Sequence, residues 1–512
     1  MERSSSTMDE EECFKVAVVG GGLAGLSAAE VLSSSTIFRK EDVVVLEASS
    51  SLGGRIQSVS GLAPWPVEIG PEFLHGTQNS SIKKLVDEMG CVQRELNFPD
   101  YYYIGHEGRL LTSEQASEHA DIEMVHDLFK ALIDEDSTPE DMSMAEYLRK
   151  KGVSSTVMSF AEAIYGNDFG CSLDKLGVHE CIQEAHQWIY GDTYIILDRP
   201  LSSVVNHVAR NLNIRLDWAV KQVEHLEGGN FRLRSQDGRT LRADFVILAV
   251  PVTTLQQSLI TFHPPLPEGK LRAAKAIGMS NVMKVVMAFT HQFWPKGLFD
   301  VVCSDCFLPE VWMTEYPEAP SAADSNGDEG CKNPGPLGQY IVVGFIAGDG
   351  ASRAAQLSEE EIFLQSLTQL DRMFGKSDHS FALGSSVWRQ PAKAEAFNAT
   401  STVSGRVFLK DDVLDPSALT YLAESPETRP ASHCFRGGMI VNWADRHFIR
   451  GGYSHPSVNA RGARLELAKP VGNIFFAGEA THPGVNPCLQ AAIDTGRRAA
   501  HEVWGTCRRS SL

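Results

Sequence analysis

Apolar residues follow two spacings along this chain, and the changes between them outline its first elements. Residues 14–19 form a short, Val-rich run that is typical of a strand covered on both faces. Apolar positions at helical spacing follow over residues 26–32, and a second apolar run at 43–46 predicts another strand. Strand, helix and strand in this order predict a βαβ unit at the start of the chain.

The rest of the chain continues this mixture of helix and strand. Helical spacing dominates between residues 81 and 152, and short β segments become common after residue 194. The further predicted elements are a helix at 201–212, strands at 214–216, 231–234, 245–250, 281–289 and 473–477, and a helix at 489–504. Residues 316–338 are polar and rich in Pro and Gly, which predicts a mobile loop. Together these elements predict an α/β protein.

Composition narrows the choice of partners and compartment. The chain has 512 residues and a formal net charge of −19, which disfavours nucleic acid and attracts cationic ligands. Ten cysteines are too few for a disulfide scaffold, and we find no secretory signal and no apolar run of bilayer length. We therefore expect a cytoplasmic protein without a membrane span. Ser510, Ser511 and Leu512 loosely resemble a peroxisomal address, which makes that compartment the alternative.

The glycine-rich turn after the first strand is the strongest chemical signal. Gly20, Gly22 and Gly25 permit a tight turn, a close approach of backbone to a pyrophosphate, and close helix packing. The helix that follows offers free N–H groups to the anion at its N-terminus. Glu47 closes the second strand, where a carboxylate accepts hydrogen bonds from a ribose. The alternative is a glycine turn without a ligand, which the strand–turn–helix context disfavours.

Two further segments fit the same nucleotide site. Gly53, Gly54 and Arg55 combine exposed backbone with a fixed cation, as the second side of a diphosphate requires. Near the other end of the chain, Gly478 and Glu479 lie between a predicted strand and a predicted helix. Both ends of the chain are therefore expected to build one site.

Together these motifs resemble the FAD-binding signatures of the flavin-containing amine oxidases, which include monoamine oxidases, polyamine oxidases and lysine-specific histone demethylases. The resemblance continues in order through VILAVP at 246–251, FHPPLP at 262–267, FWP at 293–295 and GGYS at 451–454. It implies a Rossmann-like FAD-binding domain interleaved with a mixed α+β substrate-binding domain. We expect a disordered N-terminus at 1–13, an FAD-binding domain of residues 14–78, 200–275 and 436–512, and a substrate-binding domain of residues 79–199 and 276–435.

Lys284 is the most informative residue of the predicted strand at 281–289. Alternation places it on one face with Val282, Val286 and Ala288, and the apolar neighbours on both faces predict a buried lysine rather than a solvated edge. Burial lowers the pKa of a lysine and favours its neutral form. The family has a lysine here that is hydrogen-bonded through water to the flavin N5, so the resemblance gives Lys284 a catalytic role.

The segment GPEFLHG at 70–76 resembles a stretch of animal polyamine oxidases that places a histidine in the substrate channel. By this resemblance His75 is a catalytic candidate near the reacting amine, and a structural hydrogen-bonding role is the alternative. Glu72 is a candidate for holding a distal ammonium of the substrate. Asp168 is a second candidate for the same task.

Aromatic residues near the C-terminus match the family as well. By resemblance Trp443 contacts the cofactor, and Tyr453 forms one wall of a catalytic aromatic cage in which an amine docks against a ring. The second wall, often Tyr, falls at Cys488. The flavin-linking Cys of monoamine oxidases falls at Gly452, so we expect non-covalent FAD. Val220 lies where the family's backbone touches the adenine, and a plain core valine is the alternative.

The chain is therefore expected to be an FAD-dependent amine oxidase that converts a small cationic amine and O2 to an aldehyde, a shorter amine and H2O2. Spermine, spermidine or their acetylated forms are the expected substrates. The alternatives are an amino-acid or monoamine oxidase, or a non-catalytic FAD-binding interaction module, which the departures from the family at 198–200 and 487–489 keep open. We expect no metal site, no nucleic-acid partner, and a monomer or weak oligomer.

Overall fold

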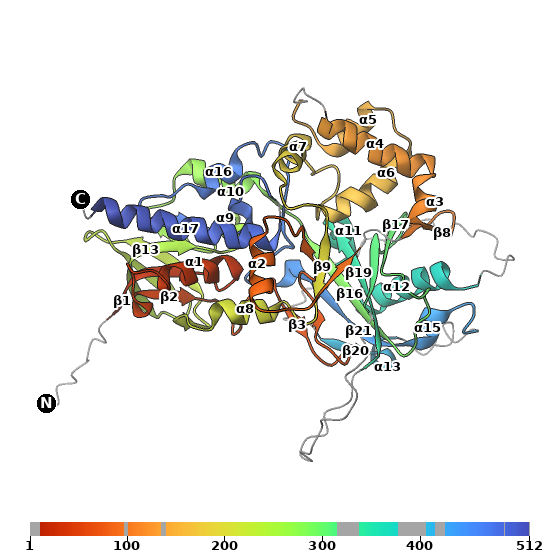
Figure 1. The fold of residues 1–512 in the computed structure, drawn as a ribbon, viewed down its shortest axis with the longest axis horizontal. Coiled ribbons are helices and arrows are strands. Elements are labelled where there is room, and N and C mark those ends of the chain that lie inside the picture. The colour runs from red at the N-terminus through yellow and green to blue at the C-terminus, as the bar shows by residue number, and fades with distance from the viewer. Residues whose placement is uncertain are drawn as a thin grey trace, which may run out of the picture.

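The computed structural model contains two eight-stranded sheets that lie side by side along the long axis of the molecule (Figure 1). The structure describes residues 11–96, 101–134, 140–314, 337–376, 406–414, 425–485 and 487–510. The sheets alternate along the chain, because the strands of the first sheet lie at 12–46, 214–263 and 474–476 and those of the second at 101–112, 282–347 and 407–442. The polypeptide thus passes repeatedly between the two sheets.

The first sheet joins both ends of the described chain. In spatial order its strands are β10 (Ile214–Arg215), β2 (Val43–Leu46), β1 (Glu12–Val19), β13 (Thr240–Leu248), β12 (Phe231–Ser235), β11 (Val220–His225) and β14 (Thr261–His263), and β23 (Ile474–Phe476) also pairs with β13. Strands β1 and β23 both pair in parallel with β13, and β2 pairs in parallel with β1. The carboxyl ends of these strands meet at one edge, which is where α/β sheets bind ligands.

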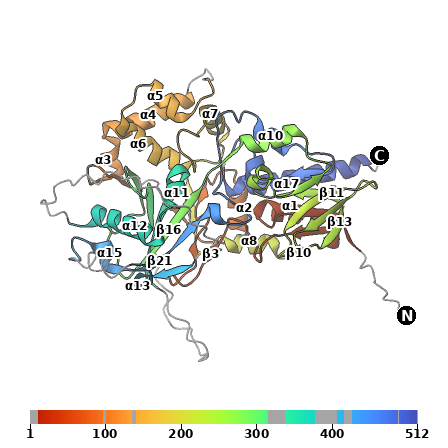
Figure 2. The same ribbon diagram turned by 180° about the vertical axis from the view of Figure 1, so that it is seen from behind.

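Helices cover both faces of this sheet. On one face, α1 (Leu23–Ser33) lies against α17 (Leu489–Ser510), as Figures 1 and 2 show from opposite sides. A Cβ at Gly496 would come within 2.1 Å of the Ala24 carbonyl oxygen, so this glycine permits the close contact of the two helices. The other face is covered by α9 (Val252–Gln256), α10 (Glu268–Ala276) and α16 (Ala463–Ala468).

The second sheet carries the predicted lysine strand at its centre. Its order is β20 (Val407–Leu409), β21 (Phe435–Asn442), β16 (Val282–Phe289), β19 (Tyr340–Ala347), β18 (Glu310–Thr314), β17 (Asp300–Ser304), β7 (Tyr101–Ile104) and β8 (Arg109–Thr112). All eight residues of β16 are buried. One face of the strand packs on α12 (Glu359–Phe374), while Val282, Val286 and Ala288 belong to a separate core on the face of Lys284. The predicted alternation and burial are confirmed.

Small elements link the two sheets. Strand β5 (Leu74–His75) pairs with β9 (Tyr194–Leu197), and β9 also pairs with β6 (Gln93–Leu96). The short helices α2 (Ser81–Glu88) and α8 (Ser202–Ala209) join the core of the first sheet.

A helical layer lies over one end of the second sheet, at the upper right of Figure 1. It consists of α3 (Ser113–Ser117), α4 (Ala120–Asp134), α5 (Met144–Lys150), α6 (Ser155–Ala161), a π-helical turn (Glu162–Gly166) and α7 (Val178–Gln187). Its apolar side chains form one core with those of β7, β8 and β17. The sequence did not predict strands β6, β7 and β8 within this helical stretch, because runs of four residues do not separate the two periodicities.

Several predicted boundaries differ from the structure. Strand β1 begins at Glu12, so residues 12 and 13 are ordered rather than part of the expected disordered N-terminus at 1–13; residues 1–10 lie outside the described chain. Strand β21 pairs with β16, so the domain boundary expected at residue 436 runs through a strand of the second sheet. Of the expected loop at 316–338, residues 316–336 are not described, and the N–H groups of Leu337 and Gly338 donate to carbonyls of the 61–62 turn.

The turn before α1 offers a test of this packing. A Cβ at Gly25 would lie 2.0 Å from the Gly20 carbonyl oxygen, whereas a Cβ at Gly22 meets no protein atom within 4 Å. We expect Gly25→Ala to destabilise the protein freed of bound small molecules by about 1–3 kcal/mol, because the backbone of the turn must move. Gly22→Ala is the matched control and should change stability by less than about 0.5 kcal/mol. Equal urea midpoints for the two variants would contradict this packing.

Candidate active site

One continuous cavity of about 1120 Å³ runs from the carboxyl edge of the first sheet to the helical layer over the second. Ligand pockets usually enclose about 300–1,000 Å³, so this cavity has room for a large cofactor together with a substrate. All sixteen site residues expected from the sequence, except Gly25, line it. Gly25 instead packs beneath the glycine turn, against Gly20.

The first half of the cavity has the features of a dinucleotide site. The Glu47 carboxylate accepts hydrogen bonds from the Gly21 N–H at 2.7 Å and from the N–H and hydroxyl of Ser49 at 2.8 and 2.7 Å. Oε2 accepts only the Gly21 N–H among these bonds and has a second lone pair, so the fixed Glu47 can also accept from a ribose hydroxyl. A Cβ at Gly22 would meet nothing, and one at Gly54 would lie 3.7 Å from the Gly22 Cα. This open backbone surface fits the pyrophosphate of a dinucleotide.

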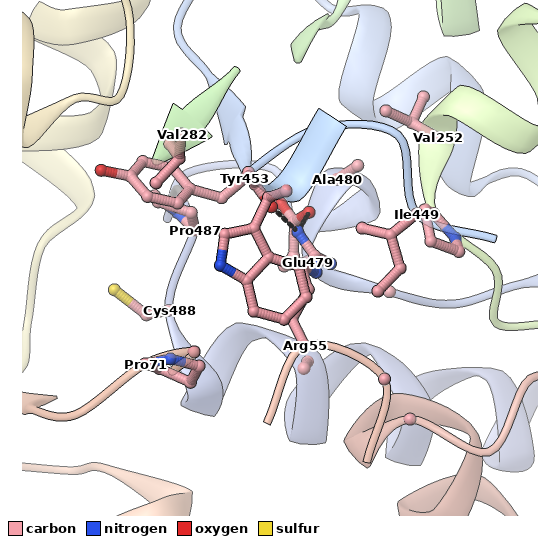
Figure 3. A pocket seen from close by; sticks show the side chains of 18 of the residues that line it. Arg55, Pro71, Val252, Val282, Ile449, Tyr453, Glu479, Ala480, Pro487 and Cys488 are labelled. Carbon is pink, nitrogen blue, oxygen red and sulfur yellow. Dashed lines mark hydrogen bonds and ion pairs between the residues drawn. The ribbon is translucent and has the colours of Figure 1, made fainter. Parts of the chain in front are cut away.

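An ion pair joins the two ends of the chain at this half of the cavity. One Arg55 nitrogen donates to Glu479 Oε1 at 2.9 Å and to the Gly452 carbonyl at 3.0 Å, as Figure 3 shows for the Arg55–Glu479 contact. Burial opposes the ionised form of Glu479, but Arg55, Arg464 and a hydrogen bond from Ser454 keep its pKa below the usual value. The sequence predicted Arg55 as a cation facing a diphosphate, and the structure balances its charge with Glu479.

The remaining cofactor candidates surround the same half. Val220 is 8% exposed and belongs to the core of the first sheet, and it also lines the cavity; its contact with an adenine stays a prediction. The Trp443 indole nitrogen donates to the Ile69 carbonyl at 3.1 Å. The Gly478 N–H donates to the Thr495 hydroxyl at 3.1 Å, which ties the end of β23 to α17.

Lys284 lies at the boundary between the two halves. Its Nζ donates to Glu72 Oε2 at 3.4 Å and to the Glu68 carbonyl at 3.3 Å, and it lies 4.9 Å from the centre of the Trp312 ring. Burial lowers the pKa of Lys284, and the charges of Glu72 and Glu68 oppose that shift. The Trp312 indole also donates to Glu72 Oε2 at 2.9 Å. Glu72, expected to hold a substrate ammonium, is therefore engaged by Lys284 and Trp312.

Glu68 is a second buried carboxyl beside this lysine. It accepts the Leu201 N–H at 2.6 Å through Oε1. Burial and the nearby charge of Glu72 raise the pKa of Glu68 to about 8, so it is mostly protonated at neutral pH. Lys284 is thus surrounded by fewer charged groups than the number of ionisable side chains beside it suggests.

His75 lies in the short strand β5, opposite Tyr194 of β9, and both residues line the cavity. Its ring lies edge-on to the Tyr194 ring at a centroid distance of 4.7 Å, and its carbonyl accepts from Gln490 of α17 at 2.9 Å. Burial lowers the pKa of His75 to about 4. Its imidazole is therefore neutral at physiological pH and offers one donor and one acceptor nitrogen.

Tyr453 is held against the cavity by the turn at 168–170. Its hydroxyl donates to the Asp168 carbonyl at 2.8 Å, and Gly170, at φ +73°, leaves room for the ring, since a Cβ there would lie 2.3 Å from it. Cys488 lies near Tyr453 in Figure 3. A Cβ at Gly452 would approach Val282 Cγ2 to 2.3 Å, so this position has no room for the linking cysteine of monoamine oxidases.

Two carboxyl groups form the polar centre of the second half. Asp168 lines the cavity, and burial raises the pKa of its carboxyl group to about 6. Burial and the charge of Asp168 raise the pKa of Glu310 to about 8, against the opposing effects of Asn167 and Lys284. The Asn167 amide donates to Glu310 Oε2 at 3.1 Å and accepts the Ala347 N–H at 3.0 Å. At neutral pH the pair therefore retains a proton that a bound cation can displace.

The sequence analysis did not single out Glu310, Asn167, Trp312 or Glu68. Glu310 begins an apolar strand, and a charged residue in such a strand was the signal that identified Lys284. The other three carry no signal of this kind, because their roles depend on neighbours far away in the sequence.

Among the described residues, no cluster of three His, Cys, Asp or Glu side chains has the arrangement of a metal site. No helix in the described ranges is both long and apolar enough to cross a bilayer.

Comparisons with known proteins agree with this geometry. A polyamine oxidase 3 from Oryza sativa subsp. japonica is 22% identical over 506 residues, covering 95% of this chain and 88% of its own. The peroxisomal N(1)-acetyl-spermine/spermidine oxidase of Homo sapiens is 25% identical and covers 98% of this chain and 97% of its own. The solved structure of cyclohexylamine oxidase from Brevibacterium oxydans has a TM-score of 0.69 at 18% identity, over 97% of this chain and 99% of that one.

The structure of putrescine oxidase bound to putrescine has a TM-score of 0.66 at 18% identity, over 96% of this chain and 99% of that one, so the fold is shared. The family model described as flavin containing amine oxidoreductase matches residues 23–425 and 421–504, which is most of the chain. The chain therefore belongs to the flavin-containing amine oxidoreductases and is an FAD-dependent enzyme that oxidises amines.

Proposed function

We propose that this enzyme is a polyamine oxidase. The observation that carries the proposal is the Asp168–Glu310 pair, which lines the cavity together with Lys284 and with side chains of the helical layer. A substrate with two or more amines can place one nitrogen at the flavin and a second, as an ammonium, between these carboxyl groups. A monoamine has no second charge to displace the proton of the pair. The names of the rice and human relatives agree with this substrate class.

The bound flavin supplies the electron-accepting chemistry of the reaction. A neutral amine loses a hydride from its α-carbon, water hydrolyses the resulting iminium to a carbonyl compound and a shorter amine, and O2 is reduced to H2O2. In our proposal Tyr453 provides the ring wall against which the reacting amine docks. Burial lowers the pKa values of Lys284 and His75, and in their neutral forms both side chains can accept or position a proton beside that amine without adding a repelling charge.

An amino-acid substrate is less consistent with the cavity. Its carboxylate would need an arginine near the reacting amine. The arginines that line the cavity are Arg55, Arg446 and Arg450. The first pairs with Glu479, the second lies over the Trp443 ring, and the third donates to Gln257. Each of these arginines therefore already has a partner within the protein.

Peroxide release from the FAD-loaded protein tests the proposal. We expect spermine, spermidine or an acylated polyamine to give a kcat/KM at least about tenfold above that of a monoamine of equal length, since one additional ion pair of 1.4 kcal/mol corresponds to that factor. A panel that includes several amino acids serves as the control. Oxidation of monoamines or amino acids in preference to every polyamine would contradict the assignment.

Replacement of the buried lysine tests its role. We expect Lys284→Met to retain bound FAD, because the side chain lies outside the dinucleotide half, and to lower kcat by about 100-fold or more. The visible flavin spectrum controls for cofactor loss, and stopped-flow reduction under anaerobic conditions separates amine oxidation from the reaction with O2. An unchanged kcat with full flavin content would remove Lys284 from the mechanism.

The carboxyl pair predicts a specific pH dependence. Glu310, with a pKa of about 8, gains its charge as the pH rises from 6 to 9, so the wild type should gain affinity for a second ammonium over this range. Glu310→Gln lacks this charge at every pH. The ratio of wild-type to variant kcat/KM for spermidine should therefore grow about tenfold between pH 6 and 9. A monoamine is the control, because it reports the titration of the reacting nitrogen alone, and its ratio of wild-type to variant kcat/KM should stay constant. A constant ratio for spermidine as well would contradict the role of Glu310.

A further inference from the structure

The cavity continues beyond Asp168 into the helical layer. We call this part the helical arm, and its lining is Phe129, Leu132, Ile133, Ile164, Tyr165 and Ile182. These side chains come from α4, the π-helical turn and α7, and all except Ile133 belong to one hydrophobic cluster. The Phe129 and Tyr165 rings stack with centroids 3.4 Å apart. The arm thus presents an apolar, partly aromatic surface to whatever extends past the carboxyl pair.

The π-helical turn fixes the arm relative to the carboxyl pair. Tyr165 lies within the turn, and Asp168 follows three residues later; both line the cavity. Asn167, between them, is hydrogen-bonded to Glu310 and to the backbone of Ala347, which anchors the segment to the second sheet. Single π-helical turns often occur at functional sites, because the wider turn redirects side chains. A ligand held by Asp168 is therefore continuous with the arm.

The described lining of the arm carries no counter-charge for an ammonium. None of its six described residues is a carboxylate; Asp168 and, on α7, Glu184 also line the cavity, and Glu184 interacts with buried Arg464. The pKa of His126, at the side of the arm, is lowered by burial, so its ring is neutral at physiological pH. A terminal ammonium placed here would lose its hydration without gaining a partner.

The arm does provide polar partners for an uncharged group. The Tyr165 hydroxyl lies 3.1 Å from His126 Nδ1, and the Tyr102 hydroxyl lies 3.4 Å from His126 Nε2. Tyr102 and His126 also line the cavity. This chain of donors and acceptors can hydrogen-bond an amide carbonyl while the apolar side chains contact the carbons attached to it.

We propose that the helical arm binds an apolar acyl group on the far nitrogen of the substrate, and that the enzyme prefers polyamines bearing an acyl group larger than acetyl. This inference rests on the proposed function, since the carboxyl pair must hold an ammonium between the reacting amine and the acylated end. Apolar surface in the arm favours such a group in proportion to the area that it removes from water.

Steady-state peroxide release from the FAD-loaded enzyme tests the inference with spermine and its terminal N-acetyl, N-hexanoyl and N-benzoyl derivatives, in which one inner nitrogen can react while the other carries the ammonium. We expect kcat/KM to rise along this series, with the hexanoyl or benzoyl compound about tenfold above spermine. Phe129→Ala should reduce the value for the benzoyl compound about tenfold and change that for spermine less than twofold. Leu128→Ala is the matched control, because Leu128 packs against the same cluster on α4 but does not line the cavity.

Ile133→Glu provides a second test on a half-buried position, which tolerates substitution better than Phe129. It places a carboxylate in the arm and should reverse the preference towards unmodified spermine, whose terminal ammonium can pair with it. Two results would contradict the proposed acyl-binding role of the helical arm while leaving polyamine oxidation intact. One is an equal or lower kcat/KM for the larger acyl compounds in the wild type. The other is an unchanged ratio of kcat/KM for acylated and unmodified substrate in both arm variants. Failure to oxidise any compound of the series would overturn both proposals.

Discussion

The ion pair between Arg55 and Glu479 connects two segments that lie at opposite ends of the chain, and the site depends on that connection. The Glu479 side chain is 6% exposed, and Arg464 and Ser454 also interact with it. Removing one partner of such a pair leaves a buried charge, which costs about 3–5 kcal/mol. The first sheet joins the same two ends of the chain, because β1 and β23 both pair with β13. The dinucleotide half of the cavity exists because these two ends meet.

The two halves of the cavity offer different physical means of binding a ligand. The dinucleotide half offers exposed backbone at Gly22 and Gly54 and the fixed carboxylate of Glu47. The substrate half relies on ionisable side chains whose charged forms are disfavoured by burial. Burial lowers the pKa of Lys284 and raises that of Glu310, so both groups tend towards neutrality within one cavity. Opposite shifts of this kind are typical of sites that exchange protons or bind ions.

The same burial cost explains how the cavity changes along its length. Beside the dinucleotide half, burial lowers the pKa values of Lys284 and His75 and so favours their uncharged forms, which suits a neutral reacting amine. Farther along, Asp168 and Glu310 can recover a charge when an ammonium arrives. The described lining of the helical arm has no carboxylate, so an uncharged group meets the smallest desolvation cost there. In our proposal, position along the cavity thus corresponds to the charge of the substrate group that it accommodates.

The sequence alone determined the elements whose signal is local. The Val-rich strands, the spacing of Gly20, Gly22 and Gly25, and the alternation around Lys284 each follow from a few neighbouring residues, and the structure has them as expected. Tertiary structure decided the partners. Glu72 faces Lys284 and Trp312, Arg55 faces Glu479, and Glu310 lies with Asp168 and Asn167 although residues 167 and 310 are far apart in the chain. Periodicity shows which face of a strand is buried, whereas the charge state of a buried group depends on which distant side chains the fold brings into contact with it.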